Sequence, residues 1–90
     1  MMTRQVVVAA TDSFETPWMR ARGNERDVVV RGLREGESVL LNFSVNRQLQ
    51  VPIPIESNGR FPFPKCTEFK FRKQVNGGPR GETYVEIEGV

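Results

Sequence analysis

Histidine is missing from this chain of 90 residues, and cysteine occurs once, as Cys66. Without histidine, neither a Ser-His-Asp nor a Cys-His catalytic arrangement can form, and no His/Cys spacing offers a zinc site. A single cysteine also excludes an internal disulfide, which suits a reducing compartment or a particle assembled in one. The simpler interpretation of Cys66 is a buried, inert thiol. We therefore expect a protein that is not an enzyme, with no catalytic residue, no cofactor and no metal.

Long hydrophobic runs and a strong charge imbalance are missing as well. The apolar stretch at residues 6–10 is too short for a membrane span or for the core of a signal peptide. Lys and Arg number 13 against 11 Asp and Glu, and this net charge of +2 does not by itself indicate nucleic acid or a membrane as partner. We expect a single soluble domain without membrane contact, made and kept in the cytosol unless something larger carries it out.

Short segments that alternate in polarity or are rich in β-branched residues recur along the chain between clusters of turn residues. This pattern is typical of a sandwich or a small barrel, and no segment shows sustained helical periodicity. The sequence therefore predicts an all-β fold, a small antiparallel β-sandwich or partly open barrel of about seven to eight short strands with an extended N-terminal arm. The predicted strands cover residues 5–9, 18–21, 27–31, 38–45, 49–55, 60–63, 67–73 and 83–88.

The first part of the chain fits the strand pattern least well. We predict that residues 1–26 form an N-terminal arm or long loop with one or two short strands, and that residues 27–90 form the sandwich core. The arm holds two large aromatic side chains and several arginines, residue types that are enriched at protein interfaces, although Trp18 would equally suit an anchor on the protein's own core. The candidate interface residues in the arm are Phe14, Trp18, Arg20 and Arg22.

Proline recurs at every second position in two neighbouring segments, as Pro52 and Pro54 and then as Pro62 and Pro64. The turn residues at 56–60 predict a β-hairpin in which these prolines oppose one another at positions that make no ladder hydrogen bond. Such a ribbon resists the addition of a further strand on either side, so it should lie at a sheet edge or project from the body. A rigid ribbon also loses little entropy on binding, and the four prolines complete the candidate interface residues.

Other clusters of turn residues predict three more hairpins, with connections at residues 32–36, 46–48 and 75–81. Strand 38–45 is the longest and is expected to be central. In the last hairpin, Phe71 is expected opposite Val85, with matched charges on the other face.

Basic and aromatic residues alternate between 65 and 73. Strand geometry sends Phe69 and Phe71 to the face opposite Lys70, which favours core aromatics beneath a polar surface. A single-stranded nucleic-acid-binding barrel would carry cations and aromatics on one exposed face, and it is retained as an alternative. A sugar-binding sandwich that uses Trp18 and Tyr84 as stacking platforms is a second alternative.

The order of elements from Val28 to Gly89 resembles the small β-sandwich structural proteins of tailed bacteriophages, which include capsid decoration or stabilising proteins and related head and tail components. The segments that carry this resemblance are 28–33, 36–41, 58–63, 69–71 and 84–89. The resemblance implies a non-enzymatic virion protein, assembled in the host cytoplasm, that binds capsid or tail subunits as a decoration or stabilising component. Such a protein would be a homo-oligomer or be repeated on a symmetric lattice. The family offers no catalytic residue or cofactor to carry over.

Overall fold

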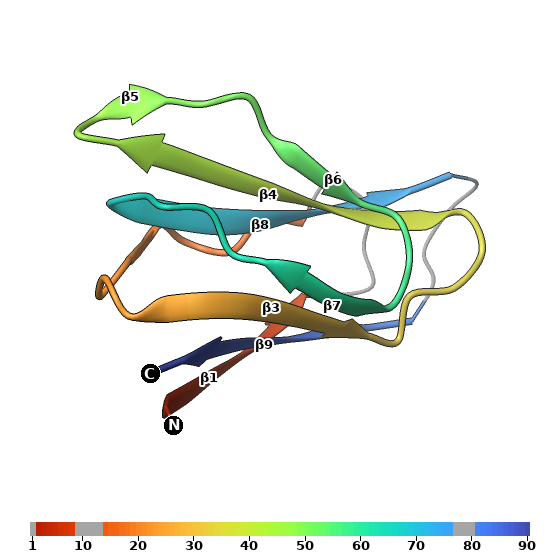
Figure 1. Cartoon of the computed structure of the whole chain (residues 1–90). Helices are drawn as coiled ribbons and strands as arrows, with labels where there is room; N and C mark the ends of the chain where they lie inside the picture. The colour runs from red at the N-terminus through yellow and green to blue at the C-terminus, as the bar shows by residue number, and fades with distance from the viewer. Residues whose placement is uncertain (1, 9–13, 77–80) are drawn as a thin grey trace.

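The computed structural model describes residues 2–8, 14–76 and 81–90, and these residues form nine strands and no helix. The strands build two antiparallel sheets that pack face to face as a small sandwich (Figure 1), which confirms the predicted fold class. The strands are β1 (Met2–Val8), β2 (Met19–Arg20), β3 (Glu25–Arg31), β4 (Glu37–Val45), β5 (Gln48–Leu49), β6 (Ile53–Ile55), β7 (Gly59–Pro62), β8 (Glu68–Val75) and β9 (Thr83–Gly89).

Sheet A has the strand order β1-β9-β3-β7, and sheet B has the order β2-β8-β4-β5. β6 also belongs to sheet B, where it pairs with the same strand, β4, as β5 does. β4 therefore lies between β8 on one side and β5 and β6 on the other, as expected for the longest strand. In Figure 1, sheet B forms the upper layer and sheet A the lower one.

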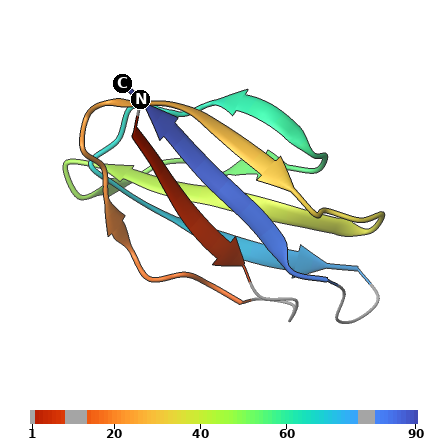
Figure 2. The same cartoon turned by 90° about the horizontal axis from the view of Figure 1, so that it is seen from below.

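The N-terminal segment takes part in both sheets. β1 pairs with β9 along its whole length, from Met2 opposite Gly89 to Val8 opposite Thr83, and the side chain of Val8 is buried in the core. Residues 14–20 run extended beside β8 and form the outer edge of sheet B (Figure 2). The predicted arm thus contributes the first strand of the sandwich, while residues 9–13 lie outside the described part of the chain.

The core lies between the sheets and is built from alternate residues of their longest strands. Phe69 and Phe71 are fully buried, while the intervening Lys70 is only half-buried on the outer face of sheet B. The predicted assignment of these two aromatics to the core is confirmed, because the period of two along a strand puts Lys70 on the opposite face. Around them cluster Val8, Val28, Val30, Leu33, Val39, Leu41, Ile55, Val85 and Ile87.

The predicted proline hairpin is wrong. Its two arms separate into different sheets: β6 pairs with β4, with Ile55 opposite Val39, and β7 pairs with β3, with Phe61 opposite Val28. Strands β3 and β4 contain no proline, so each arm gains a partner with a full set of N–H donors instead of a partner that lacks them. The side chain of Asn58 fixes the crossing, because it accepts a hydrogen bond from Leu33 N (2.8 Å) and donates one to Leu33 O (3.0 Å).

Of the three other predicted hairpins, only the shortest forms. Asn46 and Arg47 both have positive φ (49° and 70°), as a two-residue type I′ turn requires, and β4 pairs with β5 across them. A two-residue connection cannot reach the opposite sheet, which lies about 10 Å away, so its strands must pair with each other.

The other two predicted hairpins do not form, since β3 and β9 belong to sheet A while β4 and β8 belong to sheet B. Residues 77–80 of the predicted turn at 75–81 lie outside the described part of the chain. Phe71 consequently lies opposite Leu41 rather than Val85, and the predicted charge matches of that hairpin are wrong as well. Gly32 makes the crossing from β3 to β4 possible: its φ is +84°, and a Cβ there would come within 2.9 Å of Glu82 O.

Candidate protein-binding surface

Apolar side chains are exposed in a row along one edge of sheet B. We call residues 48–55, which contain β5 and β6, the β5–β6 edge; it runs along the top of the molecule in Figure 1. The exposed fraction is 73% for Leu49, 85% for Val51 and 36% for Ile53, whereas Ile55 is buried at 2%. An exposed apolar row that continues into the core is the kind of surface that marks a binding site.

The β5–β6 edge is exposed because no described strand pairs with its outer side, yet the main chain holds it in place. Leu49 pairs with Ser44 of β4, and Gln50 N donates a hydrogen bond to Phe43 O (3.0 Å). The side chain of Gln50 also donates to Gln48 O (3.0 Å). A partner would therefore meet a segment that is already ordered, and little conformational entropy would be lost on binding.

Pro52 and Pro54 shape the outer side of this edge, and both are exposed. Pro54 lies opposite Leu40 of β4. A proline has no N–H, so it fits a position of the ladder at which the two strands make no hydrogen bond. At such a position the nitrogen of Pro54 faces away from β4. The free side of the edge consequently lacks a donor at this residue. A partner can contact the apolar side chains, but extension of the sheet by a further strand is disfavoured.

The eight interface residues predicted from sequence do not form one surface. Pro52 and Pro54 lie on the β5–β6 edge, Pro62 lies in β7 at the edge of sheet A, and Pro64 follows β7 and is half-buried. The other four lie at the opposite end of sheet B, beyond β8, because β2 and β5 are its two ends. Those four residues are Phe14, Trp18, Arg20 and Arg22.

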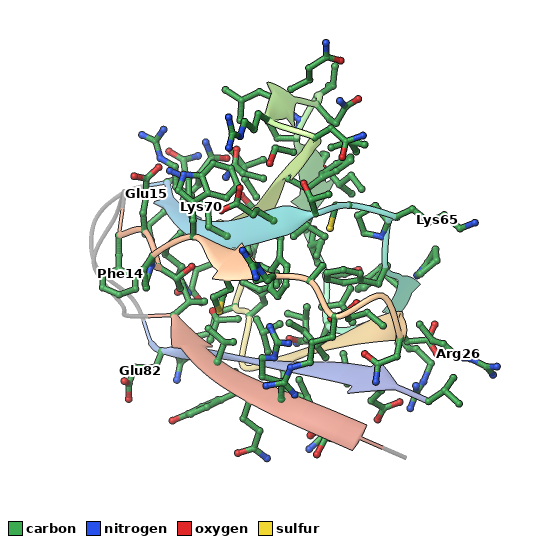
Figure 3. All side chains as sticks on the ribbon, turned by 90° about the vertical axis from the view of Figure 1, so that its left-hand side faces the viewer. Phe14, Glu15, Arg26, Lys65, Lys70 and Glu82 are labelled. Atoms are coloured by element: carbon green, nitrogen blue, oxygen red, sulfur yellow. The ribbon has the colours of Figure 1, made fainter. Side chains whose placement is uncertain are left out.

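The cluster around Trp18 is largely satisfied within the chain. Figure 3 shows Phe14, Glu15 and Lys70 at one edge of the sandwich. The Lys70 ammonium lies 4.9 Å from the centre of the Trp18 ring and 3.4 Å from the Glu15 carboxylate. Trp18 is 41% exposed, so it packs against its own sheet and still presents part of its ring.

The main-chain atoms of the two arginines of this cluster also have hydrogen-bond partners in the described chain. Arg20 O accepts a hydrogen bond from the Arg4 guanidinium (3.2 Å), and Arg22 N donates to the Glu25 carboxylate (2.7 Å). These contacts use the backbone and leave both side chains exposed. The cluster thus anchors the N-terminal part of sheet B and offers a weaker candidate surface than the β5–β6 edge.

The most exposed large apolar residues in the described part of the chain, Leu49 and Val51, are not among the residues that the sequence pattern indicates as interface candidates. Because Leu49 and Val51 alternate with Gln50 and Pro52, the sequence predicts a strand here. In the predicted proline hairpin, the apolar side chains of this strand would pack against the second arm. A usable signal was present nonetheless: apolar residues next to prolines mark an edge strand, and the outermost residues of an edge have few neighbours.

The aromatic residues needed by the two alternative functions are not placed to serve them. Phe69 and Phe71 are fully buried, so neither ring is available to stack on a nucleotide base. Tyr84 lies on β9 in sheet A, whereas Trp18 lies beside Lys70 of β8 in sheet B, so the two rings belong to different sheets. No observation on the described chain favours nucleic acid or a sugar that bridges these rings.

A charge network crosses the outer face of sheet A. Arg60 of β7 reaches Asp27 of β3 (3.3 Å) and Glu88 of β9, and so ties together three neighbouring strands. The hydrogen bond from Arg60 lowers the pKa of Glu88 below its ordinary value of 4.5. Because Arg60 is exposed, we regard the network as a contribution to solubility and strand register rather than as a ligand site.

A buried ion pair lies at the end of the sandwich where the chain crosses between the sheets. Lys73 Nζ of β8 lies 2.8 Å from Glu37 Oε2 of β4, and both side chains are fully buried. The ammonium also donates to Gly81 O (3.0 Å) and to the hydroxyl of Thr83 at the start of β9, so it links sheet B to sheet A. Arg34 N donates to the other Glu37 oxygen (2.7 Å). The alternation of basic and aromatic residues between 65 and 73 does not predict this role of Lys73, because its partners lie on other strands.

The environment of Glu37 makes stability depend on pH. Burial raises its pKa, but the hydrogen bonds from Lys73 and from the Arg34 amide outweigh burial and bring the pKa below its ordinary value of 4.5. A lowered folded-state pKa contributes stability that is fully present above pH 4.5 and is lost as the pH falls through the folded-state value.

We expect the free energy of unfolding to be nearly constant between neutral pH and pH 4.5 and to fall below that, with a shallower fall in the Glu37→Gln variant. Urea unfolding followed by circular dichroism at a series of pH values measures this slope. The Glu82→Gln variant, which changes an exposed carboxylate, should keep the slope of the parent protein. Equal slopes for the parent and Glu37→Gln would show that Glu37 does not carry the effect.

Cys66 is half-buried, and burial raises the pKa of its thiol to about 11, so it is a neutral thiol at physiological pH. Among the described residues, no group of His, Cys, Asp and Glu side chains gathers in a way that could hold a metal ion. The same part of the chain contains no helix long and apolar enough to cross a membrane.

Comparisons with protein-family models, with curated proteins and with solved structures find no match.

Proposed function

We propose that this protein is a non-enzymatic structural component of a bacteriophage particle that binds capsid or tail subunits and so decorates or stabilises the assembled virion. The observation that carries the proposal is the β5–β6 edge, where Leu49 and Val51 are exposed on an ordered segment. The resemblance of the element order at residues 28–89 to small phage sandwich proteins supplies the particle class. Localisation in the virion, after assembly in the host cytoplasm, belongs to the same proposal.

The chemistry of the edge favours a protein partner with an apolar groove. Complete burial of an aliphatic side chain such as Leu49 or Val51 stabilises a complex by about 1.5–3 kcal/mol. Pro54 leaves the edge without a donor at this residue, so specificity has to come from side chains that fit a pocket. Nucleic acid offers no such apolar pocket, and its phosphates would require cations on this edge.

A contact that uses so few apolar side chains is weak by itself. Loss of rotational and translational freedom opposes association, so a single copy would bind with modest affinity. Repetition on a symmetric lattice changes this, because each bound copy adds the same contact to one assembled particle. A small sandwich with an ordered apolar edge is therefore suited to a repeated site rather than to an isolated receptor.

The experiment is co-sedimentation with particles assembled in the absence of the protein. We expect the double variant Leu49→Lys, Val51→Lys to remain folded, since both side chains are more than 70% exposed, and to lose at least about tenfold in particle binding. The expected loss follows from the replacement of two apolar contacts by two charges that would have to be desolvated.

The matched control is the double variant Tyr84→Lys, Val90→Lys, which adds the same charge at two exposed positions in and beside β9. It should bind particles as well as the parent does. Particle binding that survives the edge substitutions, or that is lost equally in the control, would contradict the proposed role of the β5–β6 edge.

A further inference from the structure

The free edges of the two sheets differ in how they are protected. Three of them carry proline: Pro62 lies in β7, Pro17 lies just before β2, and Pro54 lies in β6. Proline supplies no backbone donor, and its presence at an edge hinders pairing with another strand. The remaining edge, β1, contains no proline in any of its seven residues.

β1 has a strand neighbour on one side only within the described chain, because sheet A begins β1-β9 (Figure 2). All seven of its residues pair with β9, so the strand is regular and has no bulge to turn its outer side away. The other side presents backbone N–H and C=O groups in the spacing that a further antiparallel strand would need. A strand of this length can therefore template pairing with another chain.

An inward-pointing charge can protect an edge, and β1 carries Arg4, but this charge is compensated inside the molecule. The Arg4 guanidinium lies 3.6 Å from the Glu25 carboxylate and 5.4 Å from the centre of the Phe69 ring. It also donates a hydrogen bond to Arg20 O (3.2 Å). Arg4 is thus held within its own protomer, where it leaves the backbone of β1 open to a partner strand.

We propose that β1 pairs antiparallel with β1 of a second copy of this chain, about a two-fold axis at Gln5. In this register Gln5 lies opposite Gln5 of the second copy, and Arg4 lies opposite Val6. A carboxamide is both donor and acceptor, so two glutamines can bond reciprocally across the axis. A two-fold contact requires such a self-complementary patch, because the same residues meet from both sides.

Registers shifted by one residue, or by two residues toward the N-terminus, are less favourable or change the sheet faces. A shift of one residue would place the outer face of one sheet A beside the inner face of the other, because side chains alternate along a strand. A shift of two residues toward the N-terminus would put Arg4 opposite Arg4, and like charges directly opposite each other are destabilising. The axis at Gln5 keeps both outer faces on one side and sets no like charges against each other.

The inner side of this edge also favours an added strand. Val6 of β1 and Met19 of β2 are partly buried hydrophobic residues that pack against the core. Paired in the proposed register, the second copy would bring its own Val6 to the same inner side, so the apolar interior would continue from one sandwich into the next. The proposal depends on β1 alone and does not rest on the particle role of the β5–β6 edge.

Sedimentation velocity over a wide range of concentration tests the proposal. We expect the parent protein to form a dimer, and Gln5→Lys and Gln5→Glu each to weaken that dimer by roughly fivefold or more, because each places two like charges across the axis. An equimolar mixture of the two variants should associate again, because Lys then faces Glu. Gln5 is exposed, so we expect both variants to retain the circular dichroism spectrum of the parent.

The same pair of substitutions at Gln48, an exposed residue on the β5–β6 edge, is the matched control and should leave the dimer unchanged. A parent protein that stays monomeric throughout, or a dimer that tolerates both Gln5 substitutions, would overturn the proposal. If a variant fails to fold, hydrogen exchange of the parent protein tests the dimer instead. Slower exchange of the β1 amides at high than at low protein concentration would support strand pairing. Equal exchange rates at both concentrations would refute it. Failure here would leave the particle-binding result untouched, since that experiment alters a different edge.

Discussion

Replacement of Lys73 by Met is expected to lower the free energy of unfolding by about 3–5 kcal/mol. The substitution conserves approximate volume but leaves the Glu37 carboxylate buried without its cationic partner, and it removes the donor to Gly81 O and Thr83. Small domains have a total stability of about 5–15 kcal/mol, so this loss is a large fraction of it. Urea unfolding followed by tryptophan fluorescence, with Trp18 as the reporter, measures the effect.

The control for charge alone is Lys65→Met, which changes an exposed lysine and should alter stability by less than about 0.5 kcal/mol. The double variant Lys73→Met, Glu37→Leu removes both buried charges together. We expect it to regain most of the loss, because replacing a whole buried pair by apolar residues is often neutral or stabilising. A double variant no more stable than Lys73→Met would show that the bonds to Gly81 and Thr83, rather than the charge pair, hold this end of the sandwich.

Replacement of Phe69 by Ala is the second change with a large expected effect, about 3–5 kcal/mol of destabilisation. Phe69 is fully buried, its ring centre lies 5.0 Å from that of Phe63 and 5.9 Å from that of Phe71, and both contacts are edge-to-face. Truncation would leave a cavity between the sheets and would also remove the ring that faces the Arg4 guanidinium. Thermal unfolding by calorimetry provides the measurement.

Phe14→Ala is the matched control, since the Phe14 ring is 37% exposed at the edge of sheet B and should contribute much less, on the order of 1 kcal/mol. The comparison also bears on the nucleic-acid alternative. Were Phe69 a stacking platform for bases, its loss would impair oligonucleotide binding and leave the folded state almost as stable as before, contrary to the expectation stated above.

The positions of most strands could be predicted from the sequence, because they depend on local pattern. Alternation of apolar and polar residues places Phe69 and Phe71 in the core, and residues 38–45 alternate as a central strand should. The tight turn predicted at residues 46–48 also forms, since so short a connection leaves little choice of partner strand; in the structure its two turn residues are Asn46 and Arg47. In each of these cases the information lies within a few residues.

Which strands pair could not be predicted, because turn residues show where the chain reverses and not which sheet it enters next. The connections at 32–36, 56–58 and 75–81 are all long enough to span the distance of about 10 Å between the sheets, and the strands before and after each of them lie in different sheets. The spacing of the prolines does not distinguish between two pairings. It fits Pro54 opposite a residue that is not proline as well as it fits Pro54 opposite another proline in a hairpin. Only the competition among all the strands for partners decides between them.

The candidate site was predicted in part. Pro52 and Pro54 lie at an edge, as predicted. Leu49 and Val51 would have a packing partner only in the predicted proline hairpin, which does not form, and both are therefore exposed. The buried role of Lys73 was equally hidden, since a cation in an alternating strand is normally solvated. Its partners Glu37 and Thr83 come from distant strands, and no local spacing connects them.

The pairing of β9 with both β1 and β3 has a consequence for biosynthesis. During translation the ribosome makes residues 83–89 after residues 2–8 and after all the strands between them, so β1 has no strand partner in its sheet until β9 has been made. Contacts between such distant segments are associated with slow folding, because a large loop has to close before they form. Until then the valine-rich strand β1 of the nascent chain remains unpaired. A chaperone therefore has more time to bind this strand than it would have in a protein whose strands pair as local hairpins.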